Sequence, residues 1–260
     1  MFEQNFKIKW VEQKHHAFFL AFFYTLVGFI SARLIFPSST GLMSVAFTSI
    51  LLIPSLAMLL KMEENVEIRE KKFHLIQLFK DHKEIFKVYI YMFLGIFIAY
   101  SFVTLFYQDI SMFEPQLRVA GLTGYAFADT YLGGIIINNL IVFAVCFLLS
   151  LVYGAGSLLF LTWNASVWGV VFAATAKMSV GGNAFLKFGT NMLPILPHMI
   201  TEALAYVFAA IVGGVVSAAV LREKIGSKKF KHVLTDAVIL LVIGIVLVFI
   251  AGYIEIIAYS

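Results

Sequence analysis

The stretch PHMITEALAYVFAAIVGGVVSAAV, residues Pro197–Val220, places a carboxylate at the head of an otherwise apolar run. At helical spacing, the residues that share a face with Glu202 are Tyr206, Ala209, Gly213 and Ser217. A row of small residues lets another helix approach closely inside a membrane. The stretch therefore predicts a membrane-spanning helix whose acid points into a bundle of helices.

The composition is that of an integral membrane protein. The chain has 260 residues, of which 61% are hydrophobic and 13% are charged, whereas about a quarter of the residues in soluble proteins are charged. The excess of positive charge, 19 Lys and Arg against 15 Asp and Glu, is small and lies in the loops. This excess bears on membrane orientation and gives no reason to expect a nucleic-acid partner.

Apolar runs recur along the chain, most of them long enough for a helix to cross the hydrocarbon core, which takes about 20 residues. The predicted spans are Ala17–Phe36, Leu42–Leu60, Val88–Tyr107, Ile135–Leu161, a short fifth from Ala165 to about Lys177, Pro197–Val220 and His232–Ala258. A tight turn at Thr162-Trp163-Asn164 is expected to separate the fourth span from the fifth. The predicted fold class is all-α, a polytopic transmembrane helical bundle of about seven spans.

The distribution of basic residues predicts the orientation, because cytoplasmic loops retain Lys and Arg. With seven spans, 15 of the 19 basic residues fall on one side, in the amino-terminal tail, residues 61–87 and residues 221–231. This count predicts a cytoplasmic amino terminus and an external carboxyl terminus. If the short fifth span did not cross, six spans would remain and five positive charges would lie outside.

We expect three regions along the chain. Residues 1–107 form an amino-terminal three-span region, in which residues 61–87 are a cytoplasmic amphipathic segment. Residues 108–134 form an outer interfacial connection, and residues 135–260 form a four-span core. Residues 178–197 are neither long nor apolar enough to cross, so a loop or a partly embedded re-entrant segment is expected there.

Small residues predict which helices form the centre. Rows of them mark spans four to six, whereas spans one, two, three and seven are rich in large apolar residues and are expected to face lipid. Most such rows mark only packing. The residues expected in helix packing are Gly154, Gly169, Ala173, Ala209 and Gly213.

His198 and Glu202 lie four residues apart, so one helix face could present both to a metal ion. A metalloprotease helix needs the pattern His-Glu-x-x-His, which the chain lacks. The other five histidines fall on the predicted cytoplasmic side. We therefore expect no metal, no cofactor and no enzymatic activity.

Several polar residues resemble those of the stage II sporulation protein M family. The resemblance rests on Asn138-Asn139 opening a span, Asn164 in the following turn, and His198 four residues before Glu202, and it covers about residues 130–222. The chain has Ala165 and Met199 where the family pattern usually has glycine. The resemblance implies a polytopic membrane scaffold. In spore formers, members of this family hold cell-wall hydrolase partners during engulfment.

The predicted function is thus a multi-pass cell-membrane scaffold that recruits or anchors other membrane or envelope proteins, with the lipid bilayer around it and a homo-oligomer left open. The alternative is a transporter or permease subunit that uses Glu202 as a proton or ion site. The predicted intramembrane polar cluster comprises Glu202, His198, Asn139 and Asn138. Asn139 is the better partner for Glu202, because it alone lies on the small-residue row. The cluster serves either as a lock between helices or as a binding or gating centre, unless Glu202 faces the surface.

Overall fold

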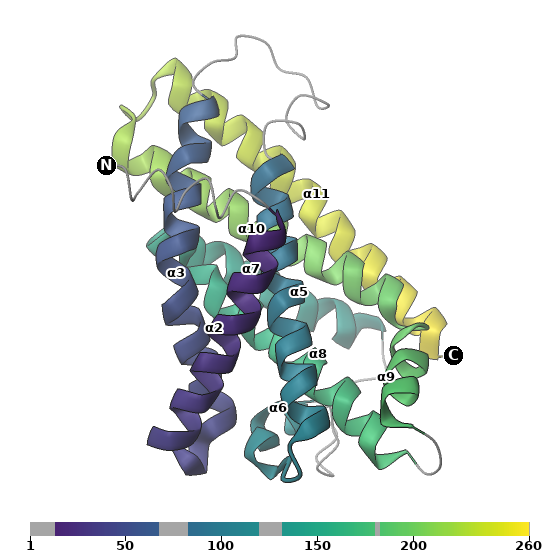
Figure 1. Cartoon of the computed structure of the whole chain (residues 1–260). Helices are drawn as coiled ribbons and strands as arrows, with labels where there is room; N and C mark the ends of the chain where they lie inside the picture. Colours follow the sequence, from purple (N-terminus) through teal and green to yellow (C-terminus); the bar gives the residue numbers. More distant parts are fainter. Residues whose placement is uncertain (1–13, 68–82, 120–131, 180–182, 260) are drawn as a thin grey trace.

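The structure is a computed structural model that describes residues 14–67, 83–119, 132–179 and 183–259 (Figure 1). Every regular element in these ranges is helical, and seven of the helices are long and apolar enough to cross a membrane. The all-α polytopic fold is therefore confirmed. The long helices are α2 (Lys14–Ile35), α3 (Thr40–Glu67), α5 (Lys83–Phe106), α7 (Leu132–Tyr153), α8 (Leu158–Met178), α10 (Leu196–Arg222) and α11 (Lys228–Tyr259).

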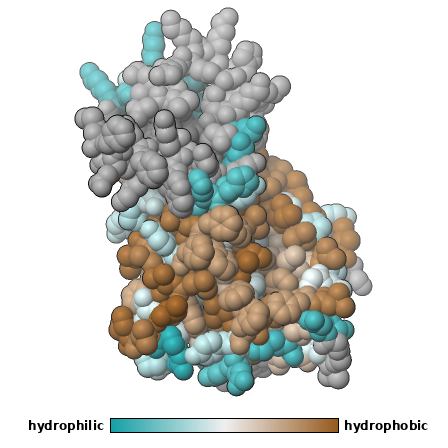
Figure 2. Space-filling view, in the orientation of Figure 1, coloured by the Kyte–Doolittle hydropathy of each residue, from teal (hydrophilic) through white to brown (hydrophobic). Residues whose placement is uncertain are grey.

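Short helices connect some of these spans. They are η1 (Pro37–Ser39), η2 (Ser111–Phe113), α6 (Glu114–Val119), η3 (Ala155–Ser157) and α9 (Ala184–Met192). Figure 2 shows apolar residues in a band across the middle of the molecule, with hydrophilic residues gathered along its lower edge. An apolar surface band of this kind is costly in water and suits the hydrocarbon core of a bilayer.

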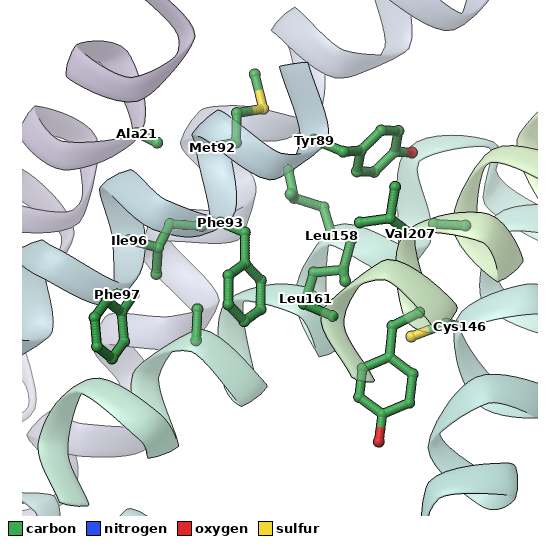
Figure 3. Packing of buried hydrophobic residues seen from close by; sticks show 14 of the residues in the cluster. Ala21, Tyr89, Met92, Phe93, Ile96, Phe97, Cys146, Leu158, Leu161 and Val207 are labelled. Atoms are coloured by element: carbon green, nitrogen blue, oxygen red, sulfur yellow. The ribbon is translucent and has the colours of Figure 1, made fainter. Parts of the chain in front are cut away.

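Helices α2, α3, α5 and α8 pack together, and we call them the first helix group. Glycines bring their backbones close: a Cβ at Gly95 of α5 would lie 3.0 Å from the Cβ of Ala21 in α2, and one at Gly169 of α8 would lie 2.6 Å from the carbonyl oxygen of Phe97 in α5. Close approach of this kind is what holds helices together in lipid. Large apolar side chains fill the remaining interior, and Figure 3 shows Leu161 of α8 beside Phe93 of α5.

Helices α7, α10 and α11 form a second helix group. Gly213 of α10 faces α7, because a Cβ there would lie 2.6 Å from the Cβ of Ser150. Gly244 of α11 faces α7, because a Cβ there would lie 2.5 Å from the ring atom Cε2 of Phe143. In Figure 1, α10 and α11 run side by side and are inclined to α2, α3 and α5.

The centre of the bundle differs from the prediction. Helix α5, expected to face lipid, has 67% of its span buried, whereas α7, expected in the centre, has 22%. The difference arises because α8 packs against α5 and contacts α7 little. Helix α10 is the most buried of the seven spans, at 72%, as its small residues indicated.

The turn between α7 and α8 also differs from the prediction. It lies at Gly154, whose φ of 63° is in the region that glycine adopts without strain. Thr162-Trp163-Asn164 is therefore inside α8, and Asn164 donates its side-chain Nδ2 to the carbonyl oxygen of Phe160 at 2.8 Å. Gly154 makes the turn and has no role in helix packing, since no atom in the described part of the chain would lie within 4 Å of a Cβ there. With the turn moved, α8 is long enough to span.

The connecting segments are only partly described. The predicted amphipathic segment at 61–87 falls largely on residues 68–82, outside the described residues. In the connection at 108–134, α6 docks into the first helix group, because Gln116 is fully buried and its Nε2 donates to the carbonyl oxygen of Gly41 at 2.9 Å. The stretch 178–197 contains α9, which rests on α5 through Phe188 and Phe97 and leaves other apolar side chains exposed.

Candidate functional site

One face of α10 carries three polar side chains at successive turns, His198, Glu202 and Tyr206. Their spacing of four residues brings each beside the next. The Nε2 atom of His198 lies 2.9 Å from Oε2 of Glu202, and the hydroxyl of Tyr206 donates to Oε1 of the same carboxyl at 2.6 Å. All three residues are buried in the bundle, with relative exposures of 7%, 6% and 0%. Both oxygens of Glu202 therefore have partners on its own helix.

Helix α7 contributes Asn139, which is buried, while the neighbouring Asn138 is exposed. The hydroxyl of Tyr206 lies 3.2 Å from Oδ1 of Asn139, but its single hydrogen is better directed to the nearer Glu202. Asn138 donates its Nδ2 to Oδ1 of Asn139 at 3.3 Å. Asn139 is thus linked to Glu202 through Tyr206, and no direct bond joins the two side chains.

Helix α11 closes the cluster from the other side. The Nδ1 atom of His198 lies 3.1 Å from the carbonyl oxygen of Ala251, and Nε2 lies 3.5 Å from Oε2 of Glu255. A carbonyl oxygen only accepts hydrogen bonds, so Nδ1 must carry a proton. The second proton is then shared along the contact between Nε2 and Glu202. Either an imidazolium faces a carboxylate, or a neutral imidazole accepts from a carboxylic acid.

The polar cluster therefore comprises His198, Glu202, Tyr206, Asn139 and Glu255, and it joins α7, α10 and α11. The prediction from the sequence did not include Glu255, although one signal pointed to it. The loop between α10 and α11 folds the two helices back on each other, so residues about equally far from it face one another. Glu255 on α11 is about as many residues from that loop as His198 is on α10, so the two lie at a similar depth. Such a cluster can bind a proton or a cation, or it can fix three helices.

The remaining predicted residues are spread over the two helix groups. Ala173 of α8 and Ala209 of α10 are fully buried, and Gly169 and Gly213 lie at close helix contacts. The described residues contain no group of three or more His, Cys, Asp or Glu side chains arranged to hold a metal ion. The separation of 2.9 Å between Nε2 of His198 and Oε2 of Glu202 is that of a hydrogen bond, and Oε2 of Glu255 lies farther away, at 3.5 Å.

One family of proteins matches nearly the whole chain. The family model for stage II sporulation protein M covers residues 17–257. The similarity is therefore wider than the stretch of about 130–222 that the sequence motifs indicated, and it includes both helix groups. No match was found among curated proteins or among solved structures.

Proposed function

Since the chain belongs to the stage II sporulation protein M family, we propose that it is a membrane scaffold that recruits or anchors partner proteins. One observation carries the proposal beyond the family. The intramembrane acid Glu202 has both oxygens bonded to neighbouring side chains, and the cluster that it centres joins three helices. The two bonds of Glu202 lie within α10, and they hold His198 against the carbonyl oxygen of Ala251 in α11 and Tyr206 beside Asn139 in α7. A fixed arrangement of this kind suits a rigid platform, because these contacts tie α10 to both of its neighbours.

The lipid-facing surface supports the same reading. Helix α11 has 33% of its span buried and α7 has 22%, so much of both is left to the surroundings. Most of the exposed side chains along α7 are aliphatic, among them Ile137, Ile141, Leu148 and Val152. Such a surface accepts lipid, and it also accepts the transmembrane helix of a partner, which needs only close packing and a few polar contacts to associate.

A second candidate function is a subunit of a transporter or permease. It is favoured by the shared proton between His198 and Glu202 and by the second carboxyl of Glu255 beside them. Ionisable groups within a membrane often form proton or ion sites. In a transporter the cluster would change its protonation state during each transport cycle. In a scaffold its protonation state would stay constant.

A crosslinking pull-down from native membranes separates the two functions. The scaffold reading expects stoichiometric recovery of a partner protein with the wild type, and the same recovery with Glu202→Gln, because glutamine can still accept the hydrogen bond from Tyr206. Glu202→Leu should loosen the second helix group and lose the partner. If Glu202→Gln keeps its thermal stability but abolishes substrate uptake in proteoliposomes, the transporter reading replaces the scaffold.

A further inference from the structure

The polar cluster does not balance its own charge. It contains two carboxyls, Glu202 and Glu255, and one imidazole whose Nδ1 proton is held by the carbonyl oxygen of Ala251. With one further proton on Nε2 of His198 or on Glu202, the net charge is −1. No Lys or Arg among the described residues lies within 4.0 Å of either carboxyl. A charge in this position is costly in lipid unless it gains another proton or a cation.

The uncompensated carboxyl can be reached from outside the bundle. The side chain of Glu202 is 8% exposed, whereas that of Glu255 is 23% exposed. Glu255 lies two residues before the end of the α11 span at Ile257, so it is close to one membrane boundary. The exposed side chains of Tyr253 and Ile257 flank it on the same helix. A group that approaches through lipid therefore meets Glu255 before the rest of the cluster.

A second observation indicates that the cluster is incomplete. Asn139 is 4% exposed, and its Nδ2 has no hydrogen-bond partner among the described residues. Turning the amide over places Nδ2 beside Tyr206 but leaves Oδ1 in the position without a partner. In either orientation one polar atom of a buried amide lacks a bond, which is uncommon in a native interior. In the turned orientation the atom without a partner is Oδ1, an acceptor that a donor such as a basic side chain can satisfy.

We propose that Glu255 receives a Lys or Arg side chain from the transmembrane helix of a partner, near the end of that helix on the side where α11 ends. This inference rests on the proposed scaffold function and names the chemistry of its partner. A basic side chain compensates the net charge of the cluster. Its long apolar stem lies along the exposed face of α11 while its charged head reaches the carboxylate. The partner needs no other specific feature than a transmembrane helix with one basic residue near this end.

The test uses the full chain in lipid nanodiscs and two synthetic transmembrane peptides. Both peptides are Leu-rich and Trp-flanked, and they differ at one position a turn from the end, where one carries Lys and the other carries Leu. Binding is measured by energy transfer between a labelled peptide and the labelled protein. The wild type should bind the Lys peptide about tenfold more tightly than the Leu peptide, which corresponds to about 1.4 kcal/mol.

The Glu255→Gln variant should bind both peptides equally. Glu114→Gln is the matched control, because it removes the same charge from an exposed acid of α6 that pairs with Arg118 outside the cluster. It should keep the tenfold preference. Equal binding of the two peptides by the wild type would mean that Glu255 is neutralised by a proton alone. Retention of the preference in Glu255→Gln would place the basic side chain elsewhere. Either result would overturn the inference.

The pull-down separates failure of this inference from failure of the proposed function. If a native partner is recovered equally with the wild type and with Glu255→Gln, the scaffold function stands and the charge pairing is wrong. If no partner is recovered with the wild type, the scaffold function is wrong, and the peptide measurement still decides what Glu255 binds.

Discussion

The two helix groups hold their polar interiors in different ways. In the first group the buried polar contacts join neutral side chains to one another and to backbone: the hydroxyls of Ser44 and Tyr100 lie 2.9 Å apart, and Gln116 donates to the carbonyl oxygen of Gly41. In the second group the buried polar contacts include ionisable residues, Glu202 and His198. Neutral hydrogen bonds inside a membrane contribute little, about 0.6 kcal/mol each, and they carry no charge cost. The ionisable cluster costs more to bury, so the second group is where we look for function.

The largest expected effect is in cysteine labelling, which tests on which side of the membrane the loops of each helix group lie. In a Cys146→Ser background, single cysteines at Asn65 after the second span and Ser227 after the sixth should react only from the cytoplasmic side. Cysteines at Pro115 and Phe185 should react only from outside. The expected outcome is all or none, measured with a membrane-impermeant maleimide on cells and on inverted vesicles. Labelling of position 227 from outside would contradict the seven-span arrangement and leave six spans.

Glycine substitutions test whether both groups depend on close helix contacts. Gly169→Leu should destabilise the first group and Gly213→Leu the second, because backbone atoms of α5 and α7 lie where the new side chains would go. Overpacking of this kind costs about 1–3 kcal/mol, measured as a lower midpoint of thermal unfolding in detergent. Gly133→Leu is the control, since no atom of the described residues lies within 4 Å of a Cβ there. Similar midpoints for all three variants would mean that the helices pack differently.

Substitution of Glu202 tests whether the second group is held by its charged cluster. Glu202→Leu leaves the Tyr206 hydroxyl with only the more distant Oδ1 of Asn139, at 3.2 Å. It leaves Nε2 of the buried His198 facing only Glu255 at 3.5 Å, which is too long for a good hydrogen bond. An unsatisfied buried polar group costs about 1–3 kcal/mol, so the thermal midpoint should fall. Glu202→Gln keeps one acceptor and should fall less. Equal stability of the two variants would show that the cluster contributes nothing to the assembly of α7, α10 and α11.

The smallest expected effect lies outside both groups, at the turn before α6. Asp109 accepts hydrogen bonds from the backbone nitrogen of Ser111 at 2.9 Å and from its hydroxyl. These bonds hold the pKa of Asp109 below its usual value. Because the folded pKa is the lower one, the contribution to stability is present above the usual aspartate pKa of about 3.9 and is lost as the pH falls below it. Asp109→Asn should therefore be slightly less stable than the wild type at pH 7 and equal to it in acid, measured by thermal unfolding. A difference that persists in acid would assign the effect to another cause.

The sequence was sufficient for the number of spans and for the all-α class, because apolar length is a local property. Helical spacing, also local, places His198 and Glu202 on one face of α10. It was misleading about which spans lie in the centre. Large apolar residues on α5 suggest lipid, yet the same residues also fill an interior once Gly95 and Gly169 bring α2 and α8 close. The turn at Gly154 was missed because Thr162-Trp163-Asn164 carries a stronger turn signal than a glycine within an apolar run. Glu255 was missed because its role appears only when α10 and α11 are folded against each other.

The interleaving of the two helix groups has a consequence for synthesis in the membrane. Helix α8 is the least apolar of the seven spans, and its main neighbour, α5, precedes it in the chain and is already in place when α8 emerges from the ribosome. Helix α7 emerges earlier, but its main neighbour, α10, is made later. It must therefore remain in the bilayer on its own for a time, and it carries no charged residue that would draw it out. Helix α7, which is made before its main neighbour, therefore has a composition that is stable in lipid without that neighbour.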